Sequence, residues 1–267
     1  MYKYIILDMD GTLLNSKKEI SEQDKNVVCQ LKDEGIRIVL ASGRHFHEMQ
    51  RYFKELHLED NDYVICCDGQ YIYNVAGKQV WNACFLTPQD IDDITTRVDN
   101  INTSLLIVTD QKNYLLVESF ASRVYCLAKN LFRRWKNIKI INGAKAGKVT
   151  RIEKIKINCN NINHAVAAAL SEYYNVNEIE GSYELLHKNV SKYSALCKLQ
   201  RLEYIDLDDA VYIGDDYNDK ECFGNLKHCV AMENAPVEVR SMAMFVTENN
   251  DNLGVSVALK KIFEVEE

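Results

Sequence analysis

The sequence feature that most restricts the fold is an apolar run from Tyr4 to Leu7, which is followed at once by Asp8, Met9, Asp10 and Gly11. Four apolar or aromatic residues without polar alternation are typical of a strand covered on both faces, as in a parallel sheet between layers of helices. Gly11 permits an immediate turn, so the two carboxylates at the strand end can approach each other. Because two such acids repel unless a cation lies between them or one is protonated, the pair favours a functional role over a purely structural one.

Two later strands are also predicted to end in polar residues. The apolar segment 36–41 is followed by Ser42, and the segment 210–214 is followed by Asp215. The carboxyl ends of parallel strands lie at one edge of a sheet, so we expect Asp8, Asp10, Ser42 and Asp215 to converge there. Carboxylate ligands without His or Cys suit magnesium, which takes its remaining ligands from water and phosphate. The sequence therefore predicts a Mg²⁺ site at this edge.

The order of the predicted elements changes twice along the chain. The first part alternates strands and helices at 4–7, 21–34, 36–41, 45–56 and 63–67, and a hairpin at 71–81 leads out of it. The middle part pairs its strands, with helices at 88–99, 120–133 and 161–173 and strands within 103–117 and at 151–157, 176–180 and 183–187. The last part alternates again, with helices at 191–203, 218–224, 236–242 and 251–263 and strands at 210–214, 228–232 and 244–247.

This order predicts an α/β protein with two domains. The alternating parts, residues 1–82 and 188–267, are expected to form one Rossmann-like, doubly wound, parallel-sheet core. The paired strands of residues 83–187 predict an inserted α+β cap domain. A chain of 267 residues is long enough for both.

Composition excludes several classes of function. The net charge of −7 argues against nucleic acid as the main partner. No run approaches the roughly 18 apolar residues of a membrane span, and the N-terminus resembles no signal peptide, so no membrane partner and a cytoplasmic location are expected. The nine cysteines form no C-x-x-C pair, so neither disulfides nor a zinc site are expected.

Lys192 and Asp216 each admit two explanations. Lys192 follows Ser191, a predicted helix N-cap, and a cation in the first turn of a helix opposes the helix dipole. Such a lysine needs an acidic neighbour or an anionic ligand, but an ordinary surface lysine explains the pattern as well. Asp216 is better explained as a helix cap than as a ligand.

Four motifs together resemble a known superfamily. They are D-M-D-G-T at 8–12, S-G-R at 42–44, Lys192, and G-D-D-Y-N-D at 214–219. In this order they resemble the motifs of the haloacid-dehalogenase-like hydrolase superfamily. The large insert, followed by A-M-E-N-A-P at 231–236 and L-G-V at 253–255, is similar to the Cof-type sugar-phosphate phosphatase branch. The resemblance covers essentially the whole chain.

The resemblance implies a role for each matching residue. Asp8 would be the nucleophile that forms an aspartyl-phosphate, and Asp10 the general acid and then the general base. Asp8, the backbone carbonyl of Asp10, and Asp215 would hold Mg²⁺. The substrate phosphate would contact Ser42, Gly43, Arg44, Lys192 and Asn218, supported by Gly11, Thr12 and Asp219, the last of which would orient Lys192 or a ligand. The substrate would be a small phosphorylated metabolite, and the cap would select it.

Two departures and two alternatives accompany this resemblance. Glu233 stands where the branch usually has Gly, and Asp68 stands where it often has Asn. A turn with Gly69 explains Asp68 better than direct catalysis does. A phosphomutase of the same superfamily and a non-catalytic sugar-phosphate-binding protein are the alternative functions. The sequence predicts neither the oligomeric state nor the substrate, and only Lys112, Glu118, Arg123 and Arg151 suggest themselves as substrate contacts in the cap.

Overall fold

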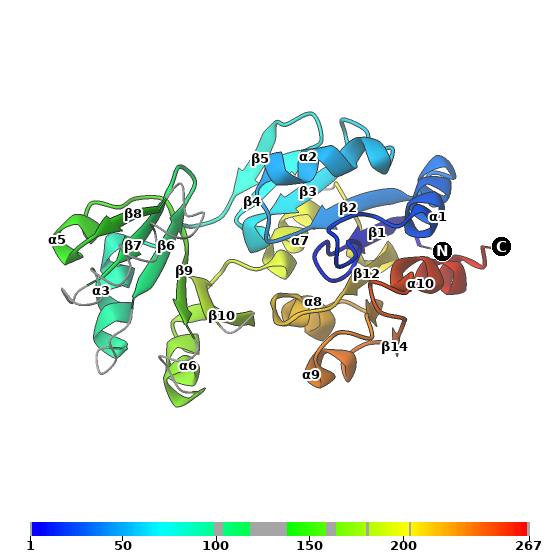
Figure 1. The fold of residues 1–267 in the computed structure, drawn as a ribbon. Coiled ribbons are helices and arrows are strands. Elements are labelled where there is room, and N and C mark those ends of the chain that lie inside the picture. Colours follow the sequence, from blue (N-terminus) through cyan, green and yellow to red (C-terminus); the bar gives the residue numbers. More distant parts are fainter. Residues whose placement is uncertain are drawn as a thin grey trace. The chain divides into compact units, whose positions relative to one another are not determined.

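The structure is a computed structural model that describes residues 2–98, 104–117, 138–158, 164–179, 182–202 and 204–265. It divides into two compact units (Figure 1): a core unit, Met1–Ala83 with Ser191–Glu267, and an inserted unit, Cys84–Val190. The boundaries expected from the sequence lay one and three residues earlier. Ala83 stays with the core because its N–H donates to the carbonyl of Gln70 at 2.8 Å. Val190 stays with the insert because its carbonyl accepts from the Asn175 side chain at 2.5 Å.

The core unit is built on an eight-stranded sheet of order β14-β13-β12-β1-β2-β3-β4-β5. Its strands are β1 (Tyr4–Leu7), β2 (Arg37–Ala41), β3 (Tyr63–Cys66), β4 (Tyr71–Asn74), β5 (Gln79–Asn82), β12 (Ala210–Gly214), β13 (Cys229–Ala231) and β14 (Phe245–Val246). All pairings from β14 to β3 are parallel. Leu7 of β1 lies opposite Leu40 of β2 and Ile213 of β12, so the residues that follow these three strands share one edge.

Helices cover both faces of this sheet. They are α1 (Glu22–Asp33), α2 (Phe46–Glu55), α7 (Lys192–Arg201), α8 (Lys220–Asn225), α9 (Val237–Arg240) and α10 (Gly254–Phe263). On one face, residues of α7, α8 and α9 form an apolar cluster with Ile6 of β1 and Tyr212 of β12. Right-handed crossovers place α1 and α2 on the opposite face, and α10 packs against α1 (Figure 1). The predicted α/β fold with a doubly wound core is confirmed.

Local sequence signals account for the positions of these elements. Ser21 caps α1, its side chain accepting from the N–H of Asp24, and Gly35 follows the helix with a φ of 96°. The helix predicted at 21–34 is therefore confirmed. The predicted hairpin is also confirmed as β4 and β5, but it extends the core sheet through antiparallel pairing with β3 and does not leave it.

The inserted unit has a six-stranded sheet of order β10-β11-β9-β6-β7-β8. Its strands are β6 (Leu105–Thr109), β7 (Asn113–Leu116), β8 (Ile138–Ile141), β9 (Ile152–Asn158), β10 (Tyr174–Ile179) and β11 (Ser182–His187). The helices α3 (Pro88–Arg97) and α6 (His164–Ser171) contribute to one apolar core with Ile107 and Ile155. The pairing is antiparallel except between β7 and β8, which run parallel.

Two elements of the inserted unit were not predicted, namely β8 and the short helix α5 (Gly143–Ala146). A strand of only four residues, one of them Lys139, gives too short an alternation of apolar and polar residues to predict a strand. The helix predicted at 120–133 lies outside the described residues, as do the first residues predicted for the helix at 161–173. None of the helices in the described ranges is long and apolar enough to cross a bilayer.

Candidate active site

The ends of β1, β2 and β12 meet at one edge of the core sheet. Asp8 follows β1, and its N–H donates to the carbonyl of Ile213 at 2.9 Å, which ties it to the end of β12. Ser42 follows β2, and its hydroxyl accepts from the N–H of Arg44 at 3.2 Å. Asp8, Ser42 and Asp215 are all buried in the structure.

Lys192 is the cation at the centre of this edge. Its side chain is 0% exposed, so the explanation as an ordinary surface lysine is wrong. The ammonium donates to Asp8 Oδ1 at 2.5 Å and to Asp219 Oδ1 at 2.6 Å. Burial alone lowers the pKa of Lys192, but the charges of Asp219 and Asp8 outweigh burial and hold the pKa well above its ordinary value. Burial raises the pKa of Asp8, which Lys192 opposes. A charged lysine therefore holds one oxygen of Asp8.

Asp219 fixes the position of Lys192. The carboxylate of Asp219 accepts a hydrogen bond from the Lys192 ammonium and three more from other groups. These donors are the hydroxyl of Tyr212, at 2.6 Å, and the N–H groups of Asp215 and Asp216, at 2.9 and 3.1 Å. Asp216 is the N-cap of the short helix Tyr217–Asp219, which confirms its prediction as a helix cap. Tyr212 was not singled out from the sequence, because an aromatic residue inside a strand is ordinarily core.

Asp215 is held by residues from two other segments. The Thr12 hydroxyl donates to Asp215 Oδ1 at 2.7 Å, and the Asn234 amide donates to Asp215 Oδ2 at 3.1 Å and to the Gly11 carbonyl at 2.9 Å. Gly11 has a φ of 88°, and a Cβ there would lie 2.2 Å from Asp215 Oδ2. Burial, and then the charge of Asp219, raise the pKa of Asp215 to about 7. Asn234 lies in a motif that only the family resemblance marked, and no signal of its own indicated this contact.

The carboxylates of Asp8, Asp215 and Asp219 form a candidate cation site, with ligand atoms that all lie within 4.8 Å of one another. Burial first, and then the charges of neighbouring acids, raise the pKa of Asp8 and of Asp215, and a bound cation would offset both effects. An all-carboxylate donor set fits a hard divalent cation. The ligand set expected from the resemblance has Asp8 and Asp215 in common with this group and names the Asp10 carbonyl in place of Asp219.

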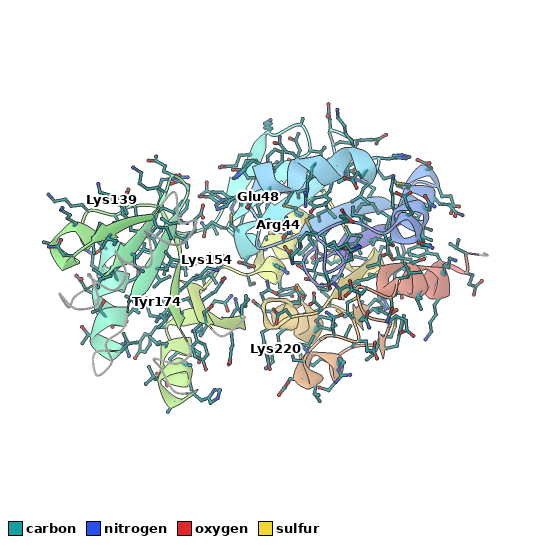
Figure 2. The ribbon with its side chains drawn as sticks, in the orientation of Figure 1. Arg44, Glu48, Lys139, Lys154, Tyr174 and Lys220 are labelled. Carbon is teal, nitrogen blue, oxygen red and sulfur yellow. The ribbon has the colours of Figure 1, made fainter. Side chains whose placement is uncertain are left out.

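The carboxylate of Asp10 lies between two cations. Arg44, labelled in Figure 2, donates through Nε to Asp10 Oδ2 at 2.5 Å and through Nη2 to Oδ1 at 2.7 Å. Lys18 donates to Oδ1 at 2.8 Å. Partial burial alone raises the pKa of Asp10, but the hydrogen bonds from Arg44 and Lys18 outweigh burial and lower the pKa to about 2. Arg44 was expected at the substrate phosphate, and the structure pairs it with Asp10. Lys18 was not predicted.

Asp68 and Asn218 meet beside the Ser42 loop. The Asn218 amide donates to Asp68 Oδ1 at 2.9 Å, and a Cβ at Gly43 would lie 2.9 Å from the same oxygen. Asp68 has a φ of 56°, as the turn with Gly69 requires. The turn interpretation was therefore incomplete, because the buried carboxylate also lies at the site. Asn218, expected to contact the phosphate, is paired here with Asp68.

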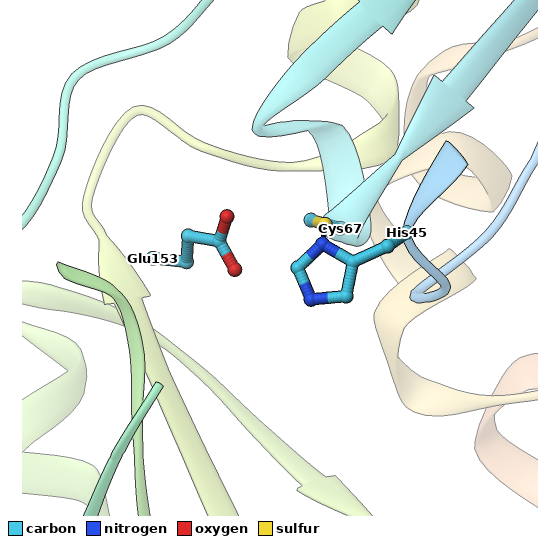
Figure 3. Close-up of side chains that lie close together, drawn as sticks. All are labelled: His45, Cys67 and Glu153. Atoms are coloured by element: carbon cyan, nitrogen blue, oxygen red, sulfur yellow. Dashed lines mark hydrogen bonds between the residues drawn. The ribbon is translucent and has the colours of Figure 1, made fainter. Parts of the chain in front are cut away.

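Cys67 and His45 lie next to this loop. Cys67 Sγ is 3.1 Å from His45 Nδ1 (Figure 3), and Cys67 has a φ of 52°. Glu153, also drawn in Figure 3, belongs to the inserted unit. Glu233, the second departure from the branch pattern, is exposed and accepts from the Asn249 amide at 3.0 Å.

The residues suggested as substrate contacts are only partly described. Arg151 pairs with Asp110, Nε to Oδ2 at 2.5 Å, and the Lys112 carbonyl accepts from the Thr109 hydroxyl at 2.6 Å. Glu118 and Arg123 lie outside the described residues.

Comparison with known proteins identifies the family. The model of the haloacid dehalogenase-like hydrolases matches residues 5–259. The chain belongs to this family. It is therefore a hydrolase, and the predicted resemblance to the superfamily is confirmed.

Two relatives of this hydrolase match it over nearly the whole of both chains. The putative phosphatase YxeH of Bacillus subtilis is 31% identical over 273 residues, 98% of each chain. The 5-amino-6-(5-phospho-D-ribitylamino)uracil phosphatase YbjI of Escherichia coli is 25% identical, over 99% of this chain and 97% of its own. The crystal structure of a haloacid dehalogenase-like hydrolase from Bacteroides thetaiotaomicron superposes with a TM-score of 0.71 at 26% identity, covering 98% of this chain and 100% of that one.

Proposed function

We propose that the chain is a magnesium-dependent phosphatase of small phosphate monoesters, which acts through an aspartyl-phosphate on Asp8. The observation that carries the proposal is the fully buried Lys192, which holds Asp8 Oδ1 at 2.5 Å while Asp219 fixes its other side at 2.6 Å. A carboxylate oriented by a buried cation beside two further acids has the arrangement that phosphoryl transfer requires, namely a fixed nucleophile and charge to stabilise phosphoryl oxygens.

The reaction has two steps. A carboxylate oxygen of Asp8 attacks phosphorus, and the bond from phosphorus to the leaving oxygen breaks. Asp10 passes a proton to that oxygen; it takes up this proton from water once Arg44 has left it for the substrate, because the hydrogen bonds from Arg44 are the largest of the interactions that lower its pKa. A water molecule then attacks phosphorus, gives a proton to Asp10, and the bond from phosphorus to Asp8 breaks to release inorganic phosphate. Ser42, Lys192 and the Gly43 backbone bind the phosphoryl oxygens during both steps. Arg44 and Asn218 join them once they exchange their present partners, Asp10 and Asp68, for the substrate.

Asp8 and Asp215 would hold Mg²⁺ together with the Asp10 carbonyl. Asp219 is the weaker ligand candidate, because its carboxylate already accepts four hydrogen bonds. When bound, the metal would neutralise negative charge on the phosphoryl oxygens.

The names of the relatives support a small phosphorylated metabolite as substrate. One is called a putative phosphatase, and another is named for a phosphoribitylamino-uracil. We infer that the inserted unit selects the leaving group and excludes water, as the resemblance to the sugar-phosphate phosphatase branch implies for its cap domain.

Phosphate release tests this function. The purified protein should release phosphate from an aryl phosphate and from sugar, nucleotide and cofactor phosphates in the presence of Mg²⁺. EDTA, or Asp8→Asn, should abolish release, whereas Asp33→Asn, the same change at an exposed acid, should not. Undiminished turnover with EDTA or in Asp8→Asn would contradict the mechanism.

The same assay separates the two alternatives. A positional isomer formed from a hexose 1-phosphate, in place of free phosphate, would identify a phosphomutase. Binding of sugar phosphates without turnover across the whole panel would identify a sugar-phosphate-binding protein. Metal-dependent release of free phosphate excludes both.

A further inference from the structure

We infer that Lys18 is a positioning residue for Asp10, and that it keeps Asp10 in place when Arg44 turns to the substrate; this inference rests on the proposed function. The Lys18 ammonium donates to Asp10 Oδ1 at 2.8 Å. Arg44 binds both oxygens, with Nη2 on Oδ1 at 2.7 Å and Nε on Oδ2 at 2.5 Å. The two cations come from different segments, Lys18 from the turn after β1 and Arg44 from the loop after β2.

The backbone of Lys18 is held by hydrogen bonds from neighbouring side chains. Lys18 has a φ of 62°, a conformation that a residue with a side chain adopts only where its surroundings enforce it. Its carbonyl accepts from the hydroxyl of Tyr52 and from Nη2 of Arg51, both at 2.9 Å. Tyr52 is 1% exposed, so this anchor is packed inside the core unit. The Arg44 guanidinium lies 5.9 Å from the centre of the same Tyr52 ring, so one buried side chain supports both cations.

Substrate binding would affect the contacts of Arg44 and of Lys18 with Asp10 differently. Arg44 lies two residues after Ser42, in the loop that the proposed function assigns to the phosphoryl group, so an incoming phosphate dianion competes with Asp10 for its guanidinium. The loss of Arg44 frees Asp10 Oδ2, because among the residues that the structure describes Arg44 Nε is the donor to this oxygen, at 2.5 Å. Lys18 stays on Oδ1, so the proton that Asp10 donates is carried by the freed Oδ2, and Lys18 fixes the direction in which Oδ2 points. Asp10 then meets the leaving oxygen in one orientation.

Fold stability gives no reason for this lysine. The Lys18 side chain is 52% exposed, and ion pairs at such positions contribute about 0–1 kcal/mol. Lys18→Met should therefore leave the protein folded, and its effect should fall on the step that needs Asp10.

The choice of leaving group shows whether a variant affects proton donation by Asp10. An alkoxide needs a proton to depart, whereas 2,4-dinitrophenolate departs without one. The value of kcat/KM reports every step through the departure of the leaving group, and it is unaffected by later hydrolysis of the aspartyl-phosphate. The comparison of an alkyl or sugar phosphate with 2,4-dinitrophenyl phosphate therefore isolates proton donation by Asp10.

The experiment measures kcat/KM for both substrates with Mg²⁺ in the wild type, Lys18→Met, Lys18→Arg and Lys17→Met. For Lys18→Met we expect a loss of roughly tenfold with the alkyl phosphate, a part of the about 10²–10⁴-fold that a general acid contributes, and no loss with the dinitrophenyl ester. Lys18→Arg keeps the cation and should recover most of the loss. Lys17→Met removes the same charge from an exposed neighbour and should behave as the wild type.

Two results would overturn the inference. Equal losses with both substrates would show that Lys18 only attracts anionic substrates or supports the fold, and unchanged values with both would show that Asp10 needs no second anchor. Asp10→Asn, measured beside them, tests the proposed function separately. If that variant retains full activity on the alkyl phosphate, the acid role of Asp10 fails. If it loses activity selectively while Lys18→Met does not, only the inference fails.

Discussion

Gly11 shows at the scale of one residue how closely the loop after β1 approaches the end of β12. Its φ is 88°, and a Cβ would lie 2.2 Å from Asp215 Oδ2, inside the candidate cation site. Gly35 has a similar φ of 96°, but no atom lies within 4 Å of a Cβ there. Both glycines therefore adopt a positive φ, but only at Gly11 would an added Cβ collide with another residue, Asp215.

Alanine substitutions at these two glycines separate the cost of backbone strain from the effect of a clash with Asp215. Gly35→Ala should cost about 1 kcal/mol of unfolding free energy, because alanine tolerates a positive φ poorly, and should leave phosphate release unchanged. Gly11→Ala should cost a similar strain and also lower kcat by roughly a hundredfold or more, because Asp215 must move. Chemical denaturation and the phosphate-release assay measure the two effects. Equal kcat values in the two variants would show that Asp215 does not need its present position.

The residues of the site were predictable where they follow strands. Asp8, Ser42 and Asp215 could be predicted because parallel pairing brings the carboxyl ends of β1, β2 and β12 to one edge. The hydrogen-bond partners of these residues could not be predicted. Tyr212 and Asn234 reach the site from a strand interior and from a loop, and the pattern of a single sequence does not show where such side chains point.

At the scale of secondary structure, the core elements were predicted because each has its own signals. Continuous apolar runs marked β1, β2 and β12, and a cap with a following glycine marked α1. The inserted unit was harder because its pairing is mixed and one strand, β8, was missed. The parallel pairing of β7 with β8 depends on contacts between segments far apart in the chain, which local pattern does not contain.

One buried carboxylate joins two of these elements. Asp24 of α1 accepts from the Ser21 hydroxyl and from the N–H of Ser256 in α10, both at 2.7 Å. Asp24→Ala leaves the buried N–H of Ser256 without this acceptor, so unfolding free energy should fall by about 2–3 kcal/mol. Asp33→Ala, an exposed position of the same helix, should change unfolding free energy by less than about 0.5 kcal/mol. Urea denaturation measures both variants. Similar values for the two would show that Asp24 does not hold α10 to α1.

At the scale of the whole molecule, the site gathers like charges that the fold must keep together. Burial and the charge of Asp219 raise the pKa of Asp215 to about 7. A carboxyl group whose pKa is higher in the folded than in the unfolded protein binds its proton more tightly when folded. Its contribution to stability is therefore complete below the unfolded pKa of about 4 and is lost as pH rises to the folded value near 7.

Bound Mg²⁺ should reverse this loss of folding stability at higher pH. Mg²⁺ binds the ionised carboxylates of the folded protein, so its stabilisation, RT ln(1 + [L]/Kd), grows with pH as protons cease to compete. In EDTA, the melting temperature should fall between about pH 5.5 and about pH 8, and the increase caused by about 5 mM Mg²⁺ should be larger at the higher pH.

Asp215→Asn provides the control for this pH dependence, because other groups also titrate between these values. The variant should lose most of the increase caused by Mg²⁺, and its melting temperature in EDTA should fall less with pH than that of the wild type, since one of the crowded acids is gone. The difference between the two proteins isolates Asp215. An increase caused by Mg²⁺ that is equal at both pH values, or that Asp215→Asn retains in full, would place the cation elsewhere.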